Sequence, residues 1–428
     1  AGPFEVEMVS LTHSIPEPNG LAIRTSAGTL FHTGDWKLDP TPVVGRPHDA
    51  ARLQAIGDEG VLALIGDSTN AMREGRSASE EDVAKTLKKI IADAPRCVAV
   101  TLFASNVARV ASIAAATHAA GRSLVVAGRA LHRVIEVAIE TGYLPRSFTY
   151  LDQQRFSELP RDKIVVLCTG SQGEPRAAIA RIAEDEHPDI SLDKGDMVIF
   201  SSRTIPGNER AVSRIQNALA RLGTELVTDA EALVHVTGHP RRDELRDMYA
   251  WIRPKIAVPM HGEARHLKEH AKLAKSCGVS QTFTIVDGEM LKLWPDPASV
   301  IDEIPTGRLF RDGNLIVPDA EGPVRARRKL SFVGIAVVAM SLSRRGEILG
   351  EPGVVLEGIP LADRDGDSMR EIVLDAIDGT VRSIPPKRRG DHLMVQDAVQ
   401  RAVRSAINEA WGKKPVVKVL LSVVDGKA

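Results

Sequence analysis

The chain has 428 residues, a formal net charge of −1, 43% hydrophobic residues and 26% charged residues, which is typical of a soluble protein of about two to four domains. The balanced charge excludes attraction of a nucleic acid by overall charge, so such a partner would have to be held by local basic patches. Three scattered cysteines without a CxxC pair, and no apolar run near the roughly 18 residues of a membrane span, favour a cytoplasmic protein without a membrane partner.

The first 75 residues predict a β-rich layer. Residues 4–11 alternate between apolar and polar side chains, residues 21–32 have the pattern of a hairpin, and residues 61–65 form an apolar run. Polar turns follow these strands, and they carry His13, Asp35 and Asp67.

Residues 76–232 predict a parallel α/β domain, because helical and strand-like patterns alternate. The segment Ser77-Ala-Ser-Glu80 resembles a capping box that opens the first helix. Strands are expected at 97–103, 123–127, 163–168 and 197–201, and helices at 106–120, 131–141, 174–183 and 209–222.

Small polar loops follow three of these strands, at 103–106, 170–175 and 201–209. In a parallel sheet, ligands sit at the carboxyl ends of the strands, and a helix N-terminus suits phosphate. These loops therefore indicate a ligand that carries phosphate. The alternative is that Ser105, Asn106 and Asn208 are only helix caps.

Residues 233–294 predict a return to the first layer, with strands at 233–236 and 255–259 and helices at 243–252 and 264–276. Residues 295–329 have the composition of a linker. Residues 330–428 predict a separate small α/β domain that begins with a strand at 331–341 and serves assembly or RNA contact.

Four residues at strand ends suggest a divided metal and phosphate site. His239 lies 22 residues before His261, and His13 lies 22 residues before Asp35. Histidine and carboxylate ligands suit zinc or manganese, and a carboxylate can bridge two metal ions that polarise a phosphodiester and activate water. Taken singly, a histidine of this kind is more often structural than a metal ligand.

The motifs resemble those of the ribonuclease J family in identity and order. They are Thr12-His-Ser-Ile-Pro16, Gly34-Asp-Trp-Lys37, Gly66-Asp-Ser-Thr-Asn70, Thr169-Gly-Ser-Gln-Gly-Glu-Pro175, His235-Val-Thr-Gly-His239 and Pro259-Met-His-Gly-Glu263. The resemblance covers essentially the whole chain. It implies an α/β fold in which a partial metallo-β-lactamase αββα domain (1–75 and 233–294) carries an inserted parallel α/β β-CASP domain (76–232), followed by a linker (295–329) and a small C-terminal α/β domain (330–428).

The resemblance also implies roles for individual residues. His13, Asp35 and His261 would be metal ligands, with Asp35 bridging, and His239 would stabilise or protonate the scissile phosphate as the catalytic residue. Asp67 would orient its neighbours. Substrate phosphate would be held by Ser105, Asn106, His235, Val236, Thr237, Gly238 and His239. Further support is expected from Ser171, Glu174, Ser202 and Arg203 in the strand-end loops. Pro240 follows His239 where the family has alanine, which removes one N–H donor.

The implied activity is a metal-dependent ribonuclease, with 5′→3′ exonuclease and endonuclease action on RNA that carries a 5′-monophosphate. The implied biological role is rRNA processing and mRNA decay in bacteria, and the implied location is the cytoplasm. The implied cofactor is zinc, two ions in an intact site, with manganese or magnesium as substitutes. The implied assembly is a homodimer or homotetramer aided by the C-terminal domain.

One family motif, His-x-His-x-Asp-His, is missing from the sequence. Because it supplies most of the metal ligands, the chain is expected to be an N-terminally incomplete form that binds metal poorly and cleaves RNA weakly. Two alternatives stay open. One is a metal-free fragment for RNA binding or assembly, and the other is a related β-CASP hydrolase that acts on DNA.

Overall fold

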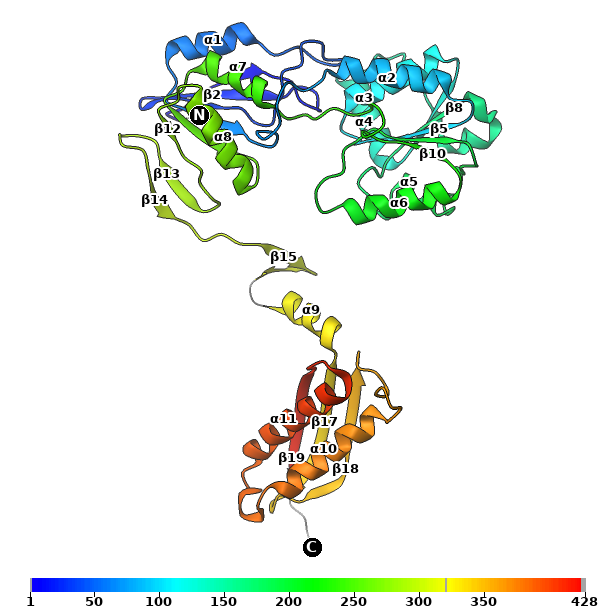
Figure 1. Cartoon of the computed structure of the whole chain (residues 1–428), viewed down its shortest axis with the longest axis vertical. Coiled ribbons are helices and arrows are strands. Elements are labelled where there is room, and N and C mark those ends of the chain that lie inside the picture. Colours follow the sequence, from blue (N-terminus) through cyan, green and yellow to red (C-terminus); the bar gives the residue numbers. More distant parts are fainter. Residues whose placement is uncertain (1, 320–321, 425–428) are drawn as a thin grey trace. The chain divides into compact units, whose positions relative to one another are not determined.

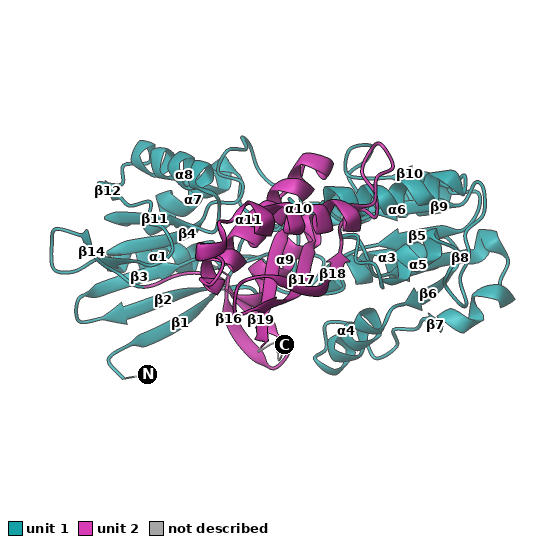
Figure 2. Ribbon diagram, turned by 90° about the horizontal axis from the view of Figure 1, so that it is seen from below, with its two compact units in different colours: residues 1–304 teal, residues 305–428 magenta. Residues whose placement is uncertain are grey.

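The computed structural model describes residues 2–319 and 322–424. The chain divides into two compact units, residues 1–304 and residues 305–428 (Figure 2). The finer division into five segments stays a prediction.

The first unit begins with a mixed six-stranded sheet in the order β1-β2-β3-β4-β11-β12. The alternating pattern at the N-terminus does form an antiparallel meander, and the apolar runs that follow pair in parallel. The strands are β1 (Glu5–Ser10), β2 (Asn19–Thr25), β3 (Gly28–His32), β4 (Ala63–Asp67), β11 (Ile256–Met260) and β12 (Gln281–Thr282).

Three helices bury one face of this sheet (Figure 1). They are α1 (Ala50–Glu59), α7 (Arg242–Ile252) and α8 (Ala264–Ser276). The core between them and the sheet includes Phe31, Leu53 and Met248. The hairpin of β13 (Glu289–Lys292) and β14 (Ser299–Glu303) follows this layer.

The second sheet of this unit is parallel throughout, in the order β10-β9-β5-β8-β6-β7. This confirms the parallel α/β prediction for the insertion. Its strands are β5 (Val98–Thr101), β6 (Ser123–Ala127), β7 (Leu151–Asp152), β8 (Ile164–Cys168), β9 (Met197–Phe200) and β10 (Glu225–Val227).

Helices cover both faces of the parallel sheet, because alternate strand residues point into two separate cores. One core receives α2 (Glu80–Asp93), α3 (Val107–Ala119) and α4 (Arg129–Glu140). The other receives α5 (Ala178–Ala183), α6 (Glu209–Arg221) and the 3₁₀ helix η1 (Gln153–Glu158); a second, η2 (Arg161–Lys163), precedes β8.

Four local predictions were wrong. The cap of α2 is Ser79, whose hydroxyl accepts from Glu81 N while Asp82 closes the capping box. No strand forms at 233–236, because the Val234 carbonyl is taken by the side chains of Arg109 and Ser201 rather than by a neighbouring strand. Helix α5 begins at Ala178 and not at 174, since residues 170–177 form turns. Residues 331–333 belong to helix α9 and not to a strand.

The second unit contains a β-hairpin, a helix and a three-stranded sheet in the order β18-β17-β19. Helices α10 and α11 bury one face of that sheet around Val338, Val373 and Val399. The elements are β15 (Leu309–Asp312), β16 (Leu315–Pro318), α9 (Pro323–Val333), β17 (Ile335–Ser343), β18 (Ile348–Glu357), α10 (Met369–Ser383), η3 (Pro386–Arg388), α11 (His392–Trp411) and β19 (Val416–Val424).

Within the described ranges, no helix has both the length and the apolar character needed to cross a membrane.

Candidate metal and phosphate site

Strand pairing in the first sheet brings together residues that are far apart in the sequence. Asp67, the last residue of β4, is in register with Met260 of β11, so His261 follows directly beside it. On the other side, Thr12 and Lys37 form an isolated antiparallel bridge, which holds the turn with His13 against the turn with Asp35. The site therefore lies at the ends of strands that pack into one layer.

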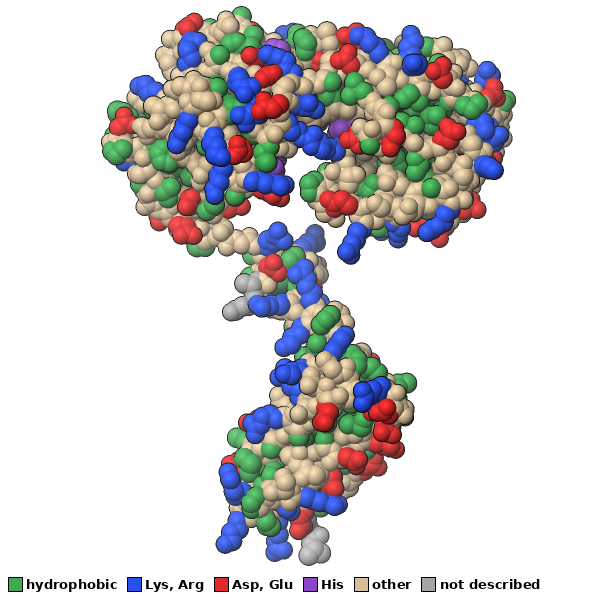
Figure 3. All heavy atoms as spheres, in the orientation of Figure 1, with side chains coloured by type: hydrophobic (Ala, Val, Ile, Leu, Met, Phe, Trp, Pro, Cys, Tyr) green, Lys and Arg blue, Asp and Glu red, His purple; other side chains and the backbone are tan. Residues whose placement is uncertain are grey.

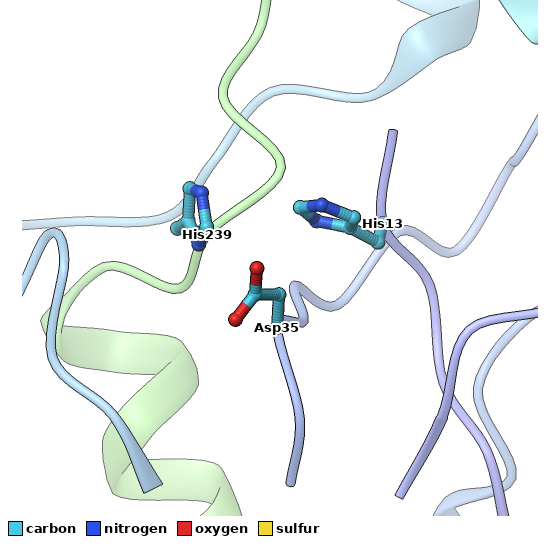
Figure 4. A group of neighbouring side chains, drawn as sticks. All are labelled: His13, Asp35 and His239. Carbon is cyan, nitrogen blue, oxygen red and sulfur yellow. The ribbon is translucent and has the colours of Figure 1, made fainter. Parts of the chain in front are cut away.

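The fifth member of the site, His239, comes from the loop between β10 and α7. Its ring lies between two other histidine rings: the ring centroids are 5.1 Å from that of His13 and 5.4 Å from that of His261. Figure 4 shows the rings of His13 and His239 with the Asp35 carboxylate pointing toward the space between them.

These side chains form two groups that could hold a metal ion. In the group of His13, Asp35 and His239, and again in the group of Asp67, His239 and His261, one ligand atom from each residue lies within 4.8 Å of the others. His261 Nε2 also lies 3.5 Å from Asp35 Oδ1. All three of the predicted ligands are therefore in one place. His239, predicted to face the phosphate, is shared by both groups.

Asp67 sets the protonation of His239. His239 Nδ1 and Asp67 Oδ2 are 2.6 Å apart, and the Asp67 carboxyl is fully buried. Burial lowers the pKa of His239, but the hydrogen bond and the negative charge of Asp67 outweigh it and raise the pKa above its usual value. Burial opposes the charged form of Asp67 as well, yet its hydrogen bond with His239 holds the pKa of the carboxyl below its usual value. The hydrogen bond with Asp67 therefore fixes the orientation of the His239 ring.

The pKa of His13 is shifted in the opposite direction, below its usual value. Burial lowers its pKa, and the hydrogen bond to the Gly238 carbonyl offsets this only in part. His13 Nδ1 lies 2.6 Å from Gly238 O. Since a carbonyl only accepts, Nδ1 carries the proton and Nε2 keeps its lone pair, the form in which a histidine binds a metal. A Cβ at Gly238 would collide with the His13 ring, so this contact requires glycine.

Two polar side chains that the sequence analysis did not single out hold the 235–239 loop. Asn70 Nδ2 donates to Thr237 Oγ1 (2.9 Å) and to His239 O (3.2 Å). Ser77 Oγ donates to the same His239 carbonyl (3.0 Å). Asn70 ends the Gly66–Asn70 motif, so its position beside Asp67 was the only signal for this role. The sequence pattern around Ser77 predicts a helix cap and gives no signal for this contact.

The backbone at His261 adopts a left-handed conformation, with φ of 54°. A non-glycine residue rarely takes this conformation unless its surroundings hold it there. Thr69 Oγ1 donates to the His261 carbonyl at 3.1 Å and also to Asp67 Oδ1 at 2.7 Å. The Gly66–Asn70 motif thereby positions both Asp67 and His261.

The predicted phosphate-binding residues differ in their surroundings. Ser105 is exposed. Asn106 is buried, and its Oδ1 accepts from Arg109 N at 2.9 Å as the cap of α3, so the cap interpretation holds for this side chain. His235 is largely buried, its Nδ1 has no hydrogen-bond partner among the described residues, and burial together with Arg109 lowers its pKa to about 3. Val236 is buried.

The supporting residues lie in the loops after β8 and β9, the two strands that flank β5 in the parallel sheet. Ser171 and Ser202 are buried, whereas Glu174 and Arg203 are exposed. Gln172 ties the two loops together, because its Nε2 donates to Arg203 O and its Oε1 accepts from Ile205 N, both at 2.9 Å. None of the four supporting residues belongs to a group of metal-binding donors.

Arginines gather next to the 235–239 loop. Burial lowers the pKa of Arg73, and the positive charges of Arg203 and Arg241 lower it further. Within the described ranges, none of the three has an ion pair. The Arg73 carbonyl accepts from Arg242 N at 3.0 Å, which places Arg73 beside the start of α7. Figure 3 shows Lys and Arg side chains along the rim of the gap between the two halves of residues 1–304.

The donor set fits zinc in kind, since zinc binds histidine nitrogen and carboxylate oxygen. His13 already has the hydrogen bond, from Nδ1 to the Gly238 carbonyl, that fixes the tautomer of a metal-binding histidine. The set is small for two ions, because the two groups of donors share His239.

Three family models match the chain. "Ribonuclease J, beta-CASP domain" matches residues 95–219, "Zn-dependent metallo-hydrolase RNA specificity domain" matches residues 225–284, and "Ribonuclease J C-terminal domain" matches residues 322–424. Together with the mixed first sheet and the parallel second sheet, they confirm the predicted fold class of a metallo-β-lactamase type with a β-CASP insertion.

Curated relatives cover nearly the whole chain. A protein named Ribonuclease J from Sinorhizobium meliloti is 51% identical over 423 residues, which are 99% of this chain and 75% of that protein. Ribonuclease J from Thermus thermophilus is 34% identical over 426 residues, 99% of this chain and 72% of that protein. Ribonuclease J from Corynebacterium glutamicum is 38% identical over 422 residues, 97% of this chain and 58% of that protein. On this evidence, the chain belongs to the ribonuclease J family.

Proposed function

We propose that this protein hydrolyses phosphodiester bonds in RNA with the help of bound metal ions. The observation that carries the proposal is the convergence of five side chains at one site. His13, Asp35, Asp67, His239 and His261 come from separate segments, and their nitrogen and oxygen atoms lie close enough to share metal ions.

His13, Asp35 and His261 would hold the metal, which is zinc in the proposal and could be replaced by manganese or magnesium. A bound divalent ion polarises a phosphodiester and lowers the pKa of water. The tautomer of His13 supports this role, because its proton is held on Nδ1 by the Gly238 carbonyl and Nε2 is free to bind. The exposure of Asp35 and His261, 41% and 49% of their side chains, leaves these ligands open to solvent and substrate.

His239 would donate the proton to the leaving oxygen. Its Nδ1 is engaged with Asp67, so its Nε2 is the atom that can face the substrate. The raised pKa of His239 supports the role, because more of the protonated form is present near neutral pH and a general acid needs that form. Asp67 stabilises the same imidazolium by its charge.

RNA as the substrate is supported by the charge around the site and by the relatives. Arg73, Arg203 and Arg241 lie near one another and form no ion pair among the described residues, and arginines of this kind bind the phosphates of a nucleic acid backbone. The printed names of the relatives are those of ribonucleases, and the model matched at 225–284 describes RNA specificity.

Finer features of the proposal rest on the family resemblance. They are 5′→3′ exonuclease and endonuclease activity on RNA with a 5′-monophosphate, a role in rRNA processing and mRNA decay, and a cytoplasmic location. They also include a homodimer or homotetramer in which the C-terminal unit takes part, and phosphate binding by Ser105 and by residues 235–239.

We expect the chain to bind metal weakly and to cleave slowly. A two-metal site needs ligands for both ions, and the described residues supply two overlapping groups that share His239. This small donor set favours the second candidate function, an RNA-binding or assembly fragment that does not cleave.

The decisive experiment offers the protein two oligonucleotides of one sequence, a 5′-monophosphorylated RNA and its DNA counterpart, with increasing zinc or manganese. We expect slow, metal-dependent cleavage of the RNA alone, lost in Asp35→Asn and kept in the matched control Asp93→Asn, an exposed carboxyl on α2. Equal cleavage of DNA would contradict the RNA assignment. RNA binding with no cleavage at any metal concentration would favour the second candidate function.

A further inference from the structure

A polar cavity lies beside the parallel sheet of the first unit, outside the metal and phosphate site. It has a volume of about 460 Å³ and lies at the carboxyl ends of the neighbouring strands β6 and β8. We call it the Arg129 cavity, and the lining residues that matter here are Arg129, His132, Asp152, Arg176, Arg181 and His187. None of them belongs to the metal-binding groups.

Three arginines give the Arg129 cavity a net positive charge. Within residues 2–319 and 322–424, Arg129, Arg176 and Arg181 form no ion pair, and the hydrogen bond of Arg181 goes to a backbone carbonyl, Glu186 O. The acidic group in the lining, Asp152, accepts from Gln154 N at 3.1 Å as a helix cap. The cationic side chains are therefore free to bind an anion.

A histidine adds a directed donor. His187 Nδ1 accepts from Asp189 N at 3.3 Å and from Ile190 N at 3.2 Å. Because both partners are donors, the proton of the neutral ring sits on Nε2. The His187 ring lines the cavity with that N–H as its remaining donor.

The start of helix α4 contributes backbone donors to the same cavity. Gly128 is the N-cap of α4 and has no side chain to cap the first turn, and both Gly128 and Arg129 line the cavity. A Cβ at position 128, where φ is +115°, would meet Thr169 Oγ1 at 2.6 Å, so glycine allows the helix to start directly beside the end of β8. An uncapped helix start after a parallel strand favours phosphate.

We propose that the Arg129 cavity binds the phosphate group of a nucleotide. Planar guanidinium groups suit phosphate oxygens, and the volume exceeds what a bare phosphate ion requires. The phosphate could belong to a free nucleoside 5′-monophosphate or to an RNA strand. The proposal does not rest on ribonuclease activity, because neither the cavity nor its arginines touch the metal-binding groups.

The test compares wild type with Arg129→Glu by isothermal titration calorimetry, using inorganic phosphate and adenosine 5′-monophosphate in a metal-free buffer. Glutamate is well tolerated in the first turn of a helix, so the variant should fold normally, which thermal melting checks. Arg221→Gln, an exposed arginine at the end of α6 without an ion pair among the described residues, is the control. We expect the variant to weaken adenosine 5′-monophosphate binding at least roughly tenfold, as for a lost charge-assisted bond, and the control to leave it unchanged.

The position of the ligand is tested separately by photo-crosslinking with 8-azidoadenosine 5′-monophosphate and peptide mapping. Labelling of peptides from residues 128–187 in wild type, lost in Arg129→Glu, would support the proposal. Competition by a 5′-hydroxyl RNA oligomer would assign the site to a strand phosphate, and competition by the free nucleotide alone would assign it to a mononucleotide. Equal binding by wild type and Arg129→Glu, or labelling confined to residues 235–261, would overturn it.

Discussion

His239 Nδ1 lies 2.6 Å from Asp67 Oδ2, although 172 positions separate the two residues. Asp67 ends the strand that leads into the parallel α/β insertion, and His239 lies in the loop that leads out of it. The pair therefore closes the insertion against the first sheet and joins a buried carboxylate to the candidate acid.

Replacing Asp67 by asparagine should lower the pKa of His239. The amide removes the negative charge that now outweighs burial, so the imidazolium loses its stabilising partner. Histidine Cε1–H resonances followed through a pH titration by NMR would measure the change. Asp93→Asn removes a charge of the same kind from an exposed position on α2 and should leave that titration as it is; an unshifted His239 in Asp67→Asn would show that the carboxylate does not control it.

Alanine variants of His239 and His261 should show which of the two histidines is a general acid and which is a metal ligand. We expect His261→Ala to lower the zinc bound per chain, because its Nε2 lies 3.5 Å from the proposed bridging carboxylate of Asp35. His239→Ala should leave bound zinc unchanged and lower any turnover by about 10²–10⁴-fold, as the loss of a general acid does. Elemental analysis after dialysis measures the metal. Equal zinc loss in both variants would make His239 a ligand, in agreement with its place in both donor groups.

Arg109→Met should destabilise the parallel domain strongly. The guanidinium of Arg109 is fully buried, lies 2.7 Å from Glu80 Oε2, and donates to Ser201 Oγ and Val234 O. Removing it leaves the Glu80 carboxylate buried without its partner, which costs about 3–5 kcal/mol. Urea unfolding measures this loss. The double variant Arg109→Met with Glu80→Leu should recover part of it, and a double variant as unstable as the single one would show that the Ser201 and Val234 contacts dominate.

Stability should fall as the pH drops because of His270. Burial lowers the pKa of His270 from 6.5 to about 4, so the folded state binds this proton less readily than the unfolded state. The stabilisation is therefore present above pH 6.5 and is lost as the pH falls toward 4, at up to about 1.4 kcal/mol per pH unit.

His270→Asn should flatten that part of the profile of unfolding free energy against pH, even though it also breaks the hydrogen bonds with Ser68 and Tyr249, both 2.8 Å. His118→Asn, at an exposed position on α3, should keep the slope. An equally steep profile in His270→Asn would assign the acid sensitivity to other groups.

Removing residues 305–428 should weaken oligomers while leaving the donor groups intact. This segment is a compact unit with its own core, and none of the donors lies in it. The cut belongs at 305 and not at 330, because helix α9 runs from Pro323 to Val333. Light scattering measures the mass, and a variant with the oligomeric mass of the full chain would remove this unit from assembly.

Periodicity was enough to predict the layers, and motif order was enough to name five residues that the structure brings close together. The alternating pattern of β1 and the repeated strand and helix patterns after residue 77 depend on local side-chain burial. These elements can therefore be predicted from the sequence. His13, Asp35, Asp67, His239 and His261 each stand in a short polar turn after an apolar run, but their proposed roles come from the resemblance of their motifs to those of the ribonuclease J family.

The partners of these residues could not be predicted from local patterns, because they are set by contacts across long sequence separations. Residues 233–236 have a strand-like composition, yet Arg109 and Ser201 take the Val234 carbonyl and no strand forms. Ser77 resembles a helix cap but holds the His239 carbonyl instead. The tautomer of His13 and the raised pKa of His239 likewise depend on Gly238 and Asp67, whose positions follow from the packing of the loop against the first sheet.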